Sequence, residues 1–178
     1  RCSSDLEPVL QKYQPDWVLV YGDTNSTLAA AVAAVKLHLP LAHLEAGLRS
    51  FNRRMPEEHN RVLTDHAADL LLAPTAVAAE HLRNEGLAER TVVVGDVMTD
   101  VVLQVKEQVK DKPSPMMEEF GFSEGAYRLA TIHRPDNTDD KARLEQILDS
   151  LADLDLPTVI LAHPRLVAKG KEHGIELG

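Results

Sequence analysis

Residues 15–61 constrain the fold more than any other part of this sequence, because strand-like and helix-like runs alternate within them. Residues 17–21 form a short apolar run rich in β-forming side chains, and this run ends abruptly at the polar segment 22–27. An alanine-rich helical run follows, and a second apolar run then ends at Glu45. Alternation of this kind predicts a parallel sheet, and open parallel sheets bind ligands at the carboxyl ends of their strands. We therefore expect the functional residues at that edge.

The same alternation continues along the whole chain and predicts the α/β fold class. The predicted strands are apolar on both faces, which is typical of a parallel sheet with helices on both faces. We predict strands over residues 17–21, 40–44, 68–73, 91–94, 128–132 and 158–162. We predict helices over residues 5–13, 26–37, 76–85, 97–109 and 138–154, one that begins at Pro56, and a last one that ends near Gly174.

Two prolines within residues 111–115 mark the best candidate for a linker. We assign residues 1–110 to a first domain, residues 111–125 to the linker and residues 126–178 to a second domain. The second domain supplies only two predicted strands, which make a poor independent sheet. The sequence also begins inside a predicted helix without an initiating Met. We therefore expect the chain to be part of a longer protein.

The composition argues against several classes of protein. Lys and Arg total 19 against 28 Asp and Glu, a net charge of −9 without a basic patch, so we expect no nucleic-acid partner. No apolar run approaches the roughly 20 residues that span a bilayer, and no secretory signal is present. The single cysteine, Cys2, excludes an internal disulfide and fits a reducing compartment. These features predict a soluble cytoplasmic protein without a membrane partner.

Acidic residues follow the first two predicted strands and open the helix that comes next. Asp23 follows the first strand, Glu45 follows the second, and Glu57 and Glu58 come directly after Pro56. Asp23 alone would also suit a turn or a helix cap, and the two adjacent glutamates would also complement the helix dipole. Grouped around one pocket, however, three carboxylates would push their pKa values apart, which suits acid–base catalysis.

In the second domain, His133-Arg134 and His163-Pro164-Arg165 each follow a predicted strand. Because Arg suits phosphate, these two strand exits are candidates for binding a phosphorylated ligand. His43, His59 and His66 match no standard zinc spacing, and we expect no metal site. The sequence contains neither GxGxxG nor GxxxxGK[ST], so the dinucleotide and P-loop fingerprints are absent.

Six short segments also form an ordered set. They are residues 22–27 (GDTNST), 43–50 (HLEAGLRS), 56–61 (PEEHNR), 94–98 (VGDVM), 131–137 (TIHRPDN) and 163–165 (HPR). Each segment is weak evidence alone, but the set in this order closely resembles the non-hydrolysing UDP-N-acetylglucosamine 2-epimerases. The resemblance extends over nearly the whole chain.

The resemblance implies two Rossmann-like domains that face a cleft in a GT-B-like architecture. Residues 1–110 would be the C-terminal part of the first domain, and residues 126–178 the N-terminal part of the second, UDP-binding domain. The implied reaction interconverts UDP-GlcNAc and UDP-ManNAc by eliminating UDP and re-adding it to 2-acetamidoglucal. The family uses neither NAD nor a required metal, so no cofactor is expected, and the resemblance favours a homodimer.

The resemblance also implies roles for individual residues. Asp23, Glu45 and Glu57 would be the acid–base carboxylates, and His133 would stabilise or protonate the departing UDP. The residues that it places on the substrate and nucleotide side are Arg49, Arg134, Asn137, His163 and Arg165.

Several alternatives stay open at this point. The substrate could be another UDP-2-acetamido sugar, such as a UDP-diacetamido uronic acid. The chain could instead be a non-catalytic fragment that self-associates through unpaired sheet edges, or a metal hydrolase built on its histidines. Because the family's N-terminal phosphate-side loop and its later Ser-Gly-Gly motif have no counterpart here, we expect a central fragment that is inactive alone.

Overall fold

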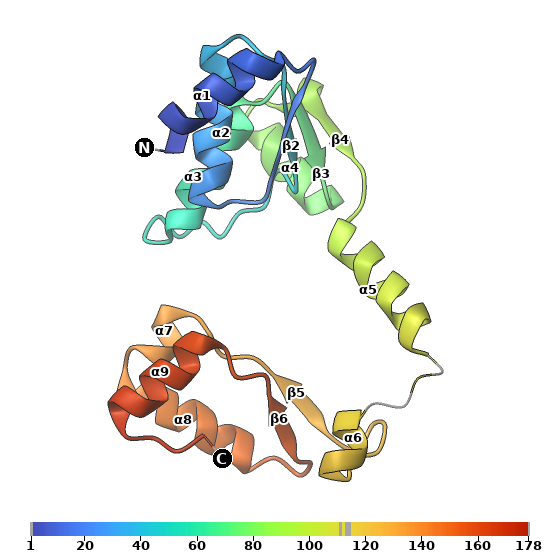
Figure 1. The fold of residues 1–178 in the computed structure, drawn as a ribbon, viewed down its shortest axis with the longest axis vertical. Helices are drawn as coiled ribbons and strands as arrows, with labels where there is room; N and C mark the ends of the chain where they lie inside the picture. Colours follow the sequence, from blue (N-terminus) through green and yellow to red (C-terminus); the bar gives the residue numbers. More distant parts are fainter. Residues whose placement is uncertain (1, 111, 113–114, 178) are drawn as a thin grey trace. The chain divides into compact units, whose positions relative to one another are not determined.

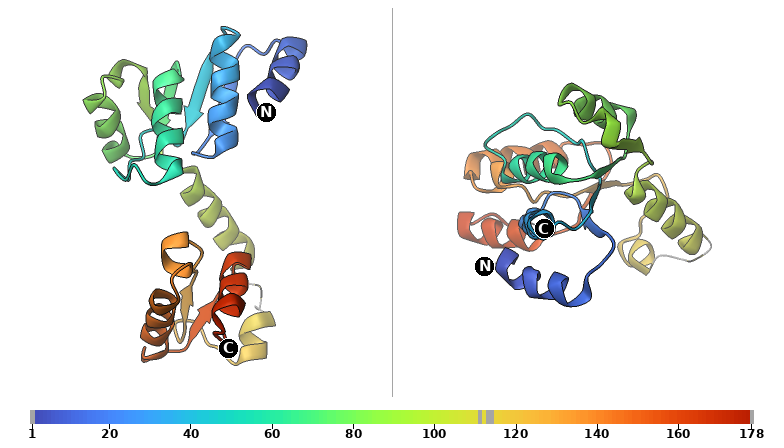
Figure 2. Two further views of the ribbon diagram at one scale, coloured as in Figure 1. Left: turned by 90° about the vertical axis from the view of Figure 1, so that its left-hand side faces the viewer. Right: turned by 90° about the horizontal axis from the view of Figure 1, so that it is seen from above.

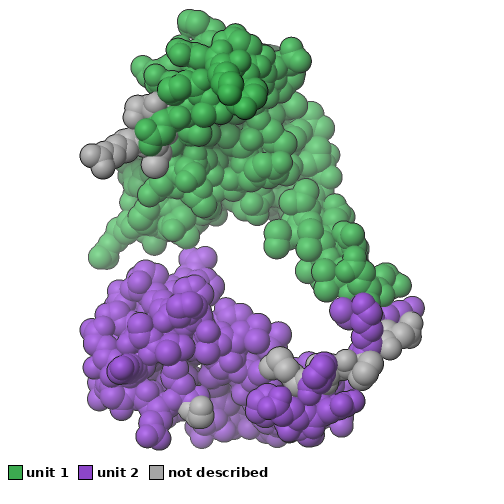
Figure 3. All heavy atoms as spheres, in the orientation of Figure 1, with its two compact units in different colours: residues 1–108 green, residues 109–178 purple. Residues whose placement is uncertain are grey.

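The structure of the chain is a computed structural model that describes residues 2–110, 112 and 115–177. It divides into two compact units, residues 1–108 and residues 109–178 (Figures 1 and 3). Positions 111, 113 and 114 of the predicted linker lie outside the described residues, and a short helix, α6 (Pro115–Phe120), lies within the predicted linker. The assignment of the two parts to domains of a larger enzyme stays a prediction.

Unit 1 is built on four parallel strands whose spatial order follows the chain. The strands are β1 (Val18–Tyr21), β2 (Leu41–Leu44), β3 (Leu70–Ala73) and β4 (Thr91–Val93). The helices are α1 (Cys2–Tyr13), α2 (Asn25–Lys36), α3 (Pro56–Ala67), α4 (Ala76–Asn84) and α5 (Val97–Val109), with a 3-10 turn, η1, at Ala88–Arg90. Tyr21 pairs with Leu44 in the register of β1 and β2, so the polar residues that follow both strands emerge at the same sheet edge.

One face of this sheet carries a layer of helices. Right-handed crossovers between strands in sequential order place α2, α3 and α4 on the same face, and Figures 1 and 2 show these helices in one layer with α1. Val20 and Leu71 lie in the buried core that the sheet forms with these helices. His43 pairs in register with both residues, so this polar side chain shares the buried face of the sheet.

The opposite face of the same sheet is apolar but more exposed. Leu19, Tyr21 and Val92 point to this face and are 44, 61 and 49% exposed. Helix α5 buries none of its residues. The strands are therefore apolar on both faces, as the sequence predicts, while the packed helices in the described part of unit 1 cover one face.

Two local features fix where α2 and α3 begin. The Thr24 side chain caps α2 by accepting a hydrogen bond from the Thr27 backbone N–H at 3.3 Å, and the Thr27 hydroxyl donates to the Tyr21 carbonyl at 2.6 Å. This pair of bonds ties the start of α2 to the end of β1. Pro56 occupies the first position of α3, as predicted, where its missing N–H breaks no helical hydrogen bond.

Unit 2 contains two parallel strands and a layer of short helices. The strands are β5 (Arg128–Ala130) and β6 (Thr158–Ile160), and the helices after α6 are α7 (Pro135–Thr138), α8 (Lys141–Ala152) and α9 (Pro164–His173). Ile132, Leu144 and Leu166 form the buried core of this unit. The core is small, in keeping with the two-stranded sheet.

The helix predicted over residues 138–154 is confirmed for residues 141–152, but its predicted start is wrong. Helix α7 ends at Thr138, and α8 begins at Lys141. The break arises because the Asp140 side chain accepts a hydrogen bond from the Arg143 backbone N–H at 2.7 Å, and so caps a new helix.

Gly47 and Gly86 provide a matched test of the packing in unit 1. Both have positive φ, +82° and +79°, but a Cβ on Gly47 would lie 2.4 Å from the Ala78 carbonyl oxygen, whereas a Cβ on Gly86 meets open space. We expect Gly47→Ala to lower the free energy of unfolding by about 2–5 kcal/mol, because strain and overpacking add. We expect Gly86→Ala to lower the free energy of unfolding by only about 1–2 kcal/mol, because it introduces backbone strain without a steric overlap. Urea unfolding followed by circular dichroism measures both, and equal losses would contradict the close approach at Gly47.

Candidate active site

Asp23 lies directly beyond β1, and two buried residues of α3 hold the turn that carries it. Arg61 Nη2 lies 2.7 Å from Asp23 Oδ2. Asn60 Nδ2 donates to the Asp23 carbonyl oxygen and to Asn25 Oδ1, both at 2.9 Å. The Asp23 side chain is nonetheless 33% exposed. Its carboxylate is therefore both oriented by α3 and accessible to a ligand.

Glu45 lies directly beyond β2 in a left-handed backbone conformation, with φ +73°. Its Oε2 atom lies 3.4 Å from the position that a Cβ on Gly22 would occupy, so the carboxylate lies against the glycine that precedes Asp23. Among the described residues, no hydrogen bond or ion pair engages this carboxylate. A left-handed conformation costs a non-glycine residue about 1–2 kcal/mol, and such strain concentrates at functional sites.

Glu57 and Glu58 are neighbours in the first turn of α3, but their surroundings differ. The buried Glu58 accepts hydrogen bonds from the Ser50 N–H and hydroxyl, both at 2.8 Å, and from the Phe51 N–H at 2.9 Å. Burial opposes ionisation of Glu58, but these donors and Arg61 outweigh it and lower its pKa. The half-buried carboxylate of Glu57 has no such partner among the described residues. Glu58 therefore holds the loop before α3, and Glu57 is free to act on a ligand.

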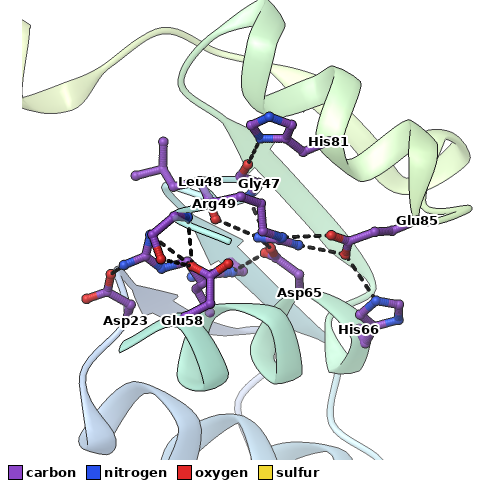
Figure 4. A network of polar contacts seen from close by, with 12 residues as sticks. Asp23, Gly47, Leu48, Arg49, Glu58, Asp65, His66, His81 and Glu85 are labelled. Atoms are coloured by element: carbon purple, nitrogen blue, oxygen red, sulfur yellow. Dashed lines mark hydrogen bonds and ion pairs between the residues drawn. The ribbon is translucent and has the colours of Figure 1, made fainter. Parts of the chain in front are cut away.

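Arg49, which the sequence predicts on the substrate side, has a structural role. Its side chain is 1% exposed, its Nε and Nη2 atoms donate to Glu85 at 2.7 Å, and its Nη1 atom donates to Asp65 Oδ2 at 2.7 Å (Figure 4). Burial acts to lower the pKa of Arg49, but the hydrogen bonds to both carboxylates outweigh it and raise the pKa. The guanidinium is buried and paired within unit 1, so the substrate contact predicted for Arg49 stays a prediction.

In unit 2, the histidines that follow the two strands lie close together. The ring centroids of His133 and His163 are 5.5 Å apart. His133 Nδ1 lies 3.2 Å from Thr131 Oγ1, and His163 Nδ1 accepts from the Arg165 backbone N–H at 3.1 Å at the start of α9. The adjacent Arg134 is exposed. This edge of unit 2 therefore combines two imidazoles with exposed positive charge, which suits an anionic group.

Arg165 and Asn137 are partly engaged within unit 2. Arg165 Nε donates to Thr138 Oγ1 at 2.9 Å, and its guanidinium also pairs with Asp139. These contacts connect α9 to α7. The Asn137 backbone N–H donates to the Arg134 carbonyl at 3.0 Å. The ligand contacts predicted for Arg165 and Asn137 stay predictions.

Sequence reasoning missed the residues that hold the carboxylates of unit 1 in place. They are Asn60, Arg61 and Asp65 in α3 and His43 in β2. One signal was available, because Glu57, Arg61 and Asp65 recur every four residues and so lie on one face of a helix. The contact between His43 and Asp65 joins residues 22 positions apart, and no local pattern indicates it.

The histidines that raised the question of a metal have separate partners. His59 Nε2 lies 2.8 Å from the Arg53 carbonyl, and His66 Nε2 lies 3.1 Å from Glu85 Oε2. In the part of the chain that the structure describes, no group of three or more His, Cys, Asp or Glu side chains could hold a metal ion. The described helices also include none that is long and apolar enough to span a bilayer.

Unit 1 therefore has the features of an acid–base site at the edge of a parallel α/β sheet, and unit 2 those of an anion site. Comparison with known proteins agrees with this class. Residues 1–171 match the family model described as UDP-N-acetylglucosamine 2-epimerase, and the chain belongs to this family.

Individual relatives cover nearly all of the chain. It is 47% identical over 183 residues to the UDP-2,3-diacetamido-2,3-dideoxy-D-glucuronate 2-epimerase of Pseudomonas aeruginosa. This match covers 99% of this chain and 50% of the relative. It is 41% identical over 178 residues to the UDP-N-acetylglucosamine 2-epimerase of Methanocaldococcus jannaschii, with 96% and 48% covered. The chain spans about half the length of the curated relatives it matches.

Solved structures give the same result. The crystal structure of the Methanocaldococcus jannaschii UDP-GlcNAc 2-epimerase in complex with UDP-GlcNAc and UDP matches with a TM-score of 0.84 at 39% identity, covering 98% of this chain and 49% of that one. The Neisseria meningitidis enzyme bound to UDP-GlcNAc matches with a TM-score of 0.79 at 28% identity, with 96% and 49% covered. The predicted fold class, a Rossmann-like parallel α/β fold of the GT-B-like type, is confirmed.

The backbone of Glu45 yields the first prediction for the site. At an ordinary helix or strand position Gly is less stable than Ala, but at φ +73° Gly has the advantage because it lacks the Cβ. We therefore expect Glu45→Gly to be more stable than Glu45→Ala by about 1 kcal/mol. Both variants lack the carboxylate, so the comparison isolates the backbone. Urea unfolding that shows Glu45→Gly as the less stable variant would contradict the left-handed conformation.

Glu85 yields a prediction about pH. Its hydrogen bonds with Arg49 hold its pKa below the ordinary value of 4.5, against the opposing effect of burial. A carboxyl group with a lowered pKa stabilises the fold above its unfolded value, and this stabilisation is lost as the pH falls through the folded value. Glu85→Gln should therefore lower the free energy of unfolding at pH 7, and its difference from the wild type should shrink on acidification below about 4.5.

The control for this experiment is Glu80→Gln, which removes an exposed ion pair with Arg83 on the same helix. Exposed pairs contribute little, so this variant should follow the wild type at every pH. Urea unfolding at several pH values between 7 and 3 measures both variants. A Glu85→Gln difference that grows on acidification would show that the pKa of Glu85 is not lowered.

Proposed function

We propose that the protein of which this chain forms all or part inverts C2 of a UDP-2-acetamido sugar by eliminating UDP and adding it back. The observation that carries the proposal is the placement of Asp23, Glu45 and Glu57. Two of them follow adjacent parallel strands, and the third lies in the first turn of α3, which begins at the same sheet edge. The carboxylates of Glu45 and Glu57 have no partner among the described residues, so they are available to take and return a proton.

The chemistry explains why more than one carboxylate is needed. The proton on C2 is a weak acid, so its removal is coupled to departure of UDP from C1. A carboxylate takes this proton, the C1–O bond breaks with its electrons going to UDP, and a C1=C2 double bond forms in 2-acetamidoglucal. In the return step the UDP oxygen attacks C1, and C2 receives a proton on the opposite face. Inversion therefore needs proton-transfer groups on both faces of the sugar ring.

We propose that unit 2 acts on the leaving group. His133 stabilises or protonates the departing UDP, and Arg134, His163, Arg165 and Asn137 contribute on the nucleotide side. The 5.5 Å spacing of the His133 and His163 rings supports this role, since both imidazoles can approach one diphosphate. Stabilising charge that develops on a leaving group is commonly a large part of the barrier reduction.

There are two candidate substrates. We propose the interconversion of UDP-GlcNAc and UDP-ManNAc, the reaction that the name of the Methanocaldococcus relative gives. The 47% identity to the Pseudomonas enzyme supports UDP-2,3-diacetamido-2,3-dideoxy-D-glucuronate as the second candidate. Mass spectrometry of the products from each sugar distinguishes the two.

Solvent deuterium tests the reaction itself. The 178-residue chain is incubated in heavy water with each sugar, beside a chimera in which this chain replaces the matching half of the Methanocaldococcus enzyme. We expect the chimera to place deuterium at C2 of one sugar and the chain alone to place none. A folded chimera that exchanges neither sugar would reject the proposal.

The adjacent glutamates of α3 give a matched pair of variants for the same assay. Glu57→Gln removes a free carboxylate, so we expect the rate of deuterium incorporation to fall by about 100-fold or more with unfolding unchanged. Glu58→Gln removes a buried acceptor of three hydrogen bonds, so we expect a loss of about 1–3 kcal/mol in the free energy of unfolding. If Glu57→Gln retained full exchange, Glu57 would not be an acid–base group.

Self-association is a second candidate property. The exposed apolar face of the sheet in unit 1 supports it, and we propose a homodimer for the complete enzyme. Sedimentation of the chain tests its self-association, and sedimentation of the chimera tests the homodimer. A monomeric chain and a monomeric chimera would reject both proposals. The cytoplasmic location stays a prediction.

A further inference from the structure

His43 is a fully buried titratable residue that the proposed reaction does not use. Its side chain and that of Asp65 are both 0% exposed. Its Nδ1 atom lies 2.6 Å from Asp65 Oδ1, and its Nε2 atom lies 2.8 Å from the Gly22 carbonyl oxygen. Both ring nitrogens therefore face hydrogen-bond acceptors.

The partners of His43 determine where its protons lie. A backbone carbonyl can only accept, so Nε2 carries a proton that it donates to Gly22. The other oxygen of Asp65 accepts from the Gly47 N–H at 3.1 Å and from Arg49 Nη1 at 2.7 Å. Donors on this side favour the ionised carboxylate, so Nδ1 also carries a proton. The contact is then an imidazolium–carboxylate pair.

Further charges lie around this pair and balance it. Arg49 contacts Asp65 and continues to Glu85 at the end of α4, and Glu85 in turn contacts His66 (Figure 4). Two cations, His43 and Arg49, therefore face two carboxylates in one connected network. Such mutual pairing offsets the cost of taking charges out of water.

The pair also connects two turns that contact Glu45. One turn contains Gly22 and follows β1, and the other contains Gly47 and follows β2. Through Nε2, His43 holds the carbonyl of Gly22, the glycine against which the Glu45 carboxylate lies. Through its second oxygen, Asp65 holds the N–H of Gly47, two residues beyond Glu45. The strained backbone of Glu45 is thus fixed from both sides.

We propose that His43 is a positioning residue that, as a buried imidazolium paired with Asp65, holds Glu45 next to the turn that carries Asp23. The protonation of His43 stands on the hydrogen-bond geometry alone. Its consequence for catalysis rests on the proposed function.

Nitrogen-15 NMR of the histidine rings tests the protonation directly. The 178-residue chain is labelled at its histidines and measured at neutral pH, and the His43 signals are assigned by their loss in a variant. We expect both ring nitrogens of His43 to carry a proton, with the Nδ1 proton shifted far downfield by its short bond to Asp65. A ring nitrogen without a proton would overturn the proposed imidazolium. This result does not depend on whether the protein is an epimerase.

Two amide variants separate the two hydrogen bonds of His43. The amide nitrogen in His43→Asn takes the place of Nδ1 and keeps the donor to Asp65, whereas in His43→Gln it takes the place of Nε2 and keeps the donor to Gly22. We expect His43→Asn to shift the backbone amide signals of Gly22 and Asp23, and His43→Gln to shift that of Gly47. If each variant moved both turns equally, the separate connections to the two turns would be rejected.

Kinetics on the chimera tests the positioning role. We expect kcat to fall by about 10- to 100-fold in His43→Asn, because small displacements of catalytic groups are costly, with KM for the UDP-sugar unchanged. His43→Gln should lose less, because it keeps the bond to the turn next to Asp23. If the folded fraction of both variants had the wild-type kcat, the positioning role would be rejected, and His43 would only stabilise the fold. If the unaltered chimera had no activity, the proposed function would be rejected. The NMR result on the protonation of His43 would still hold.

Discussion

The buried carboxylate of Asp65 is the interaction on which the site of unit 1 depends. It accepts hydrogen bonds from His43 in β2 and from Gly47 and Arg49 in the loop that follows, so one side chain of α3 fixes both a strand and its exit. Arg61, one helical turn earlier, reaches Asp23 beyond β1. Apolar contacts would tolerate some sliding of α3 over the sheet, but directional bonds between buried charged groups do not. Helix α3 therefore sets the relative positions of the two strand exits.

Carboxylates in unit 1 fall into two groups according to their donors. Glu58 and Asp65 are buried, and several donors engage each of them, so they hold the backbone. Glu45 and Glu57 lie at the same sheet edge without such donors among the described residues. For these four carboxylates, occupied oxygens accompany a structural role and free oxygens a candidate catalytic role, whereas Asp23 combines an ion pair to Arg61 with a side chain that is 33% exposed. This difference follows from donor placement and not from residue type.

Much of the fold could be predicted from the sequence, because apolar periodicity and turn residues are local signals. The bounds of α5 and the Pro56 start of α3 followed from such signals. The split between α7 and α8 did not, because Thr138 and Asp140 both suit a helix N-cap, and only the structure shows that the Asp140 side chain accepts from the Arg143 N–H. Strand exits placed Asp23 and Glu45 at one edge, and the family resemblance supplied their roles. The pairing of Arg49 could not be predicted, because its partners, Asp65 and Glu85, lie 16 and 36 residues away and are brought to it only by the fold.

The apolar face of the sheet opposite the helices has a thermodynamic consequence. The heat-capacity change on unfolding reflects the apolar surface that enters water, about 12–15 cal/mol/K per residue for an ordinary domain. Leu19, Tyr21 and Val92, together with the apolar side chains of α5, are already substantially in contact with water in the folded chain. Their further exposure on unfolding is correspondingly small. The stability curve of this chain should therefore be flatter than its length suggests, with a weaker dependence of unfolding enthalpy on temperature.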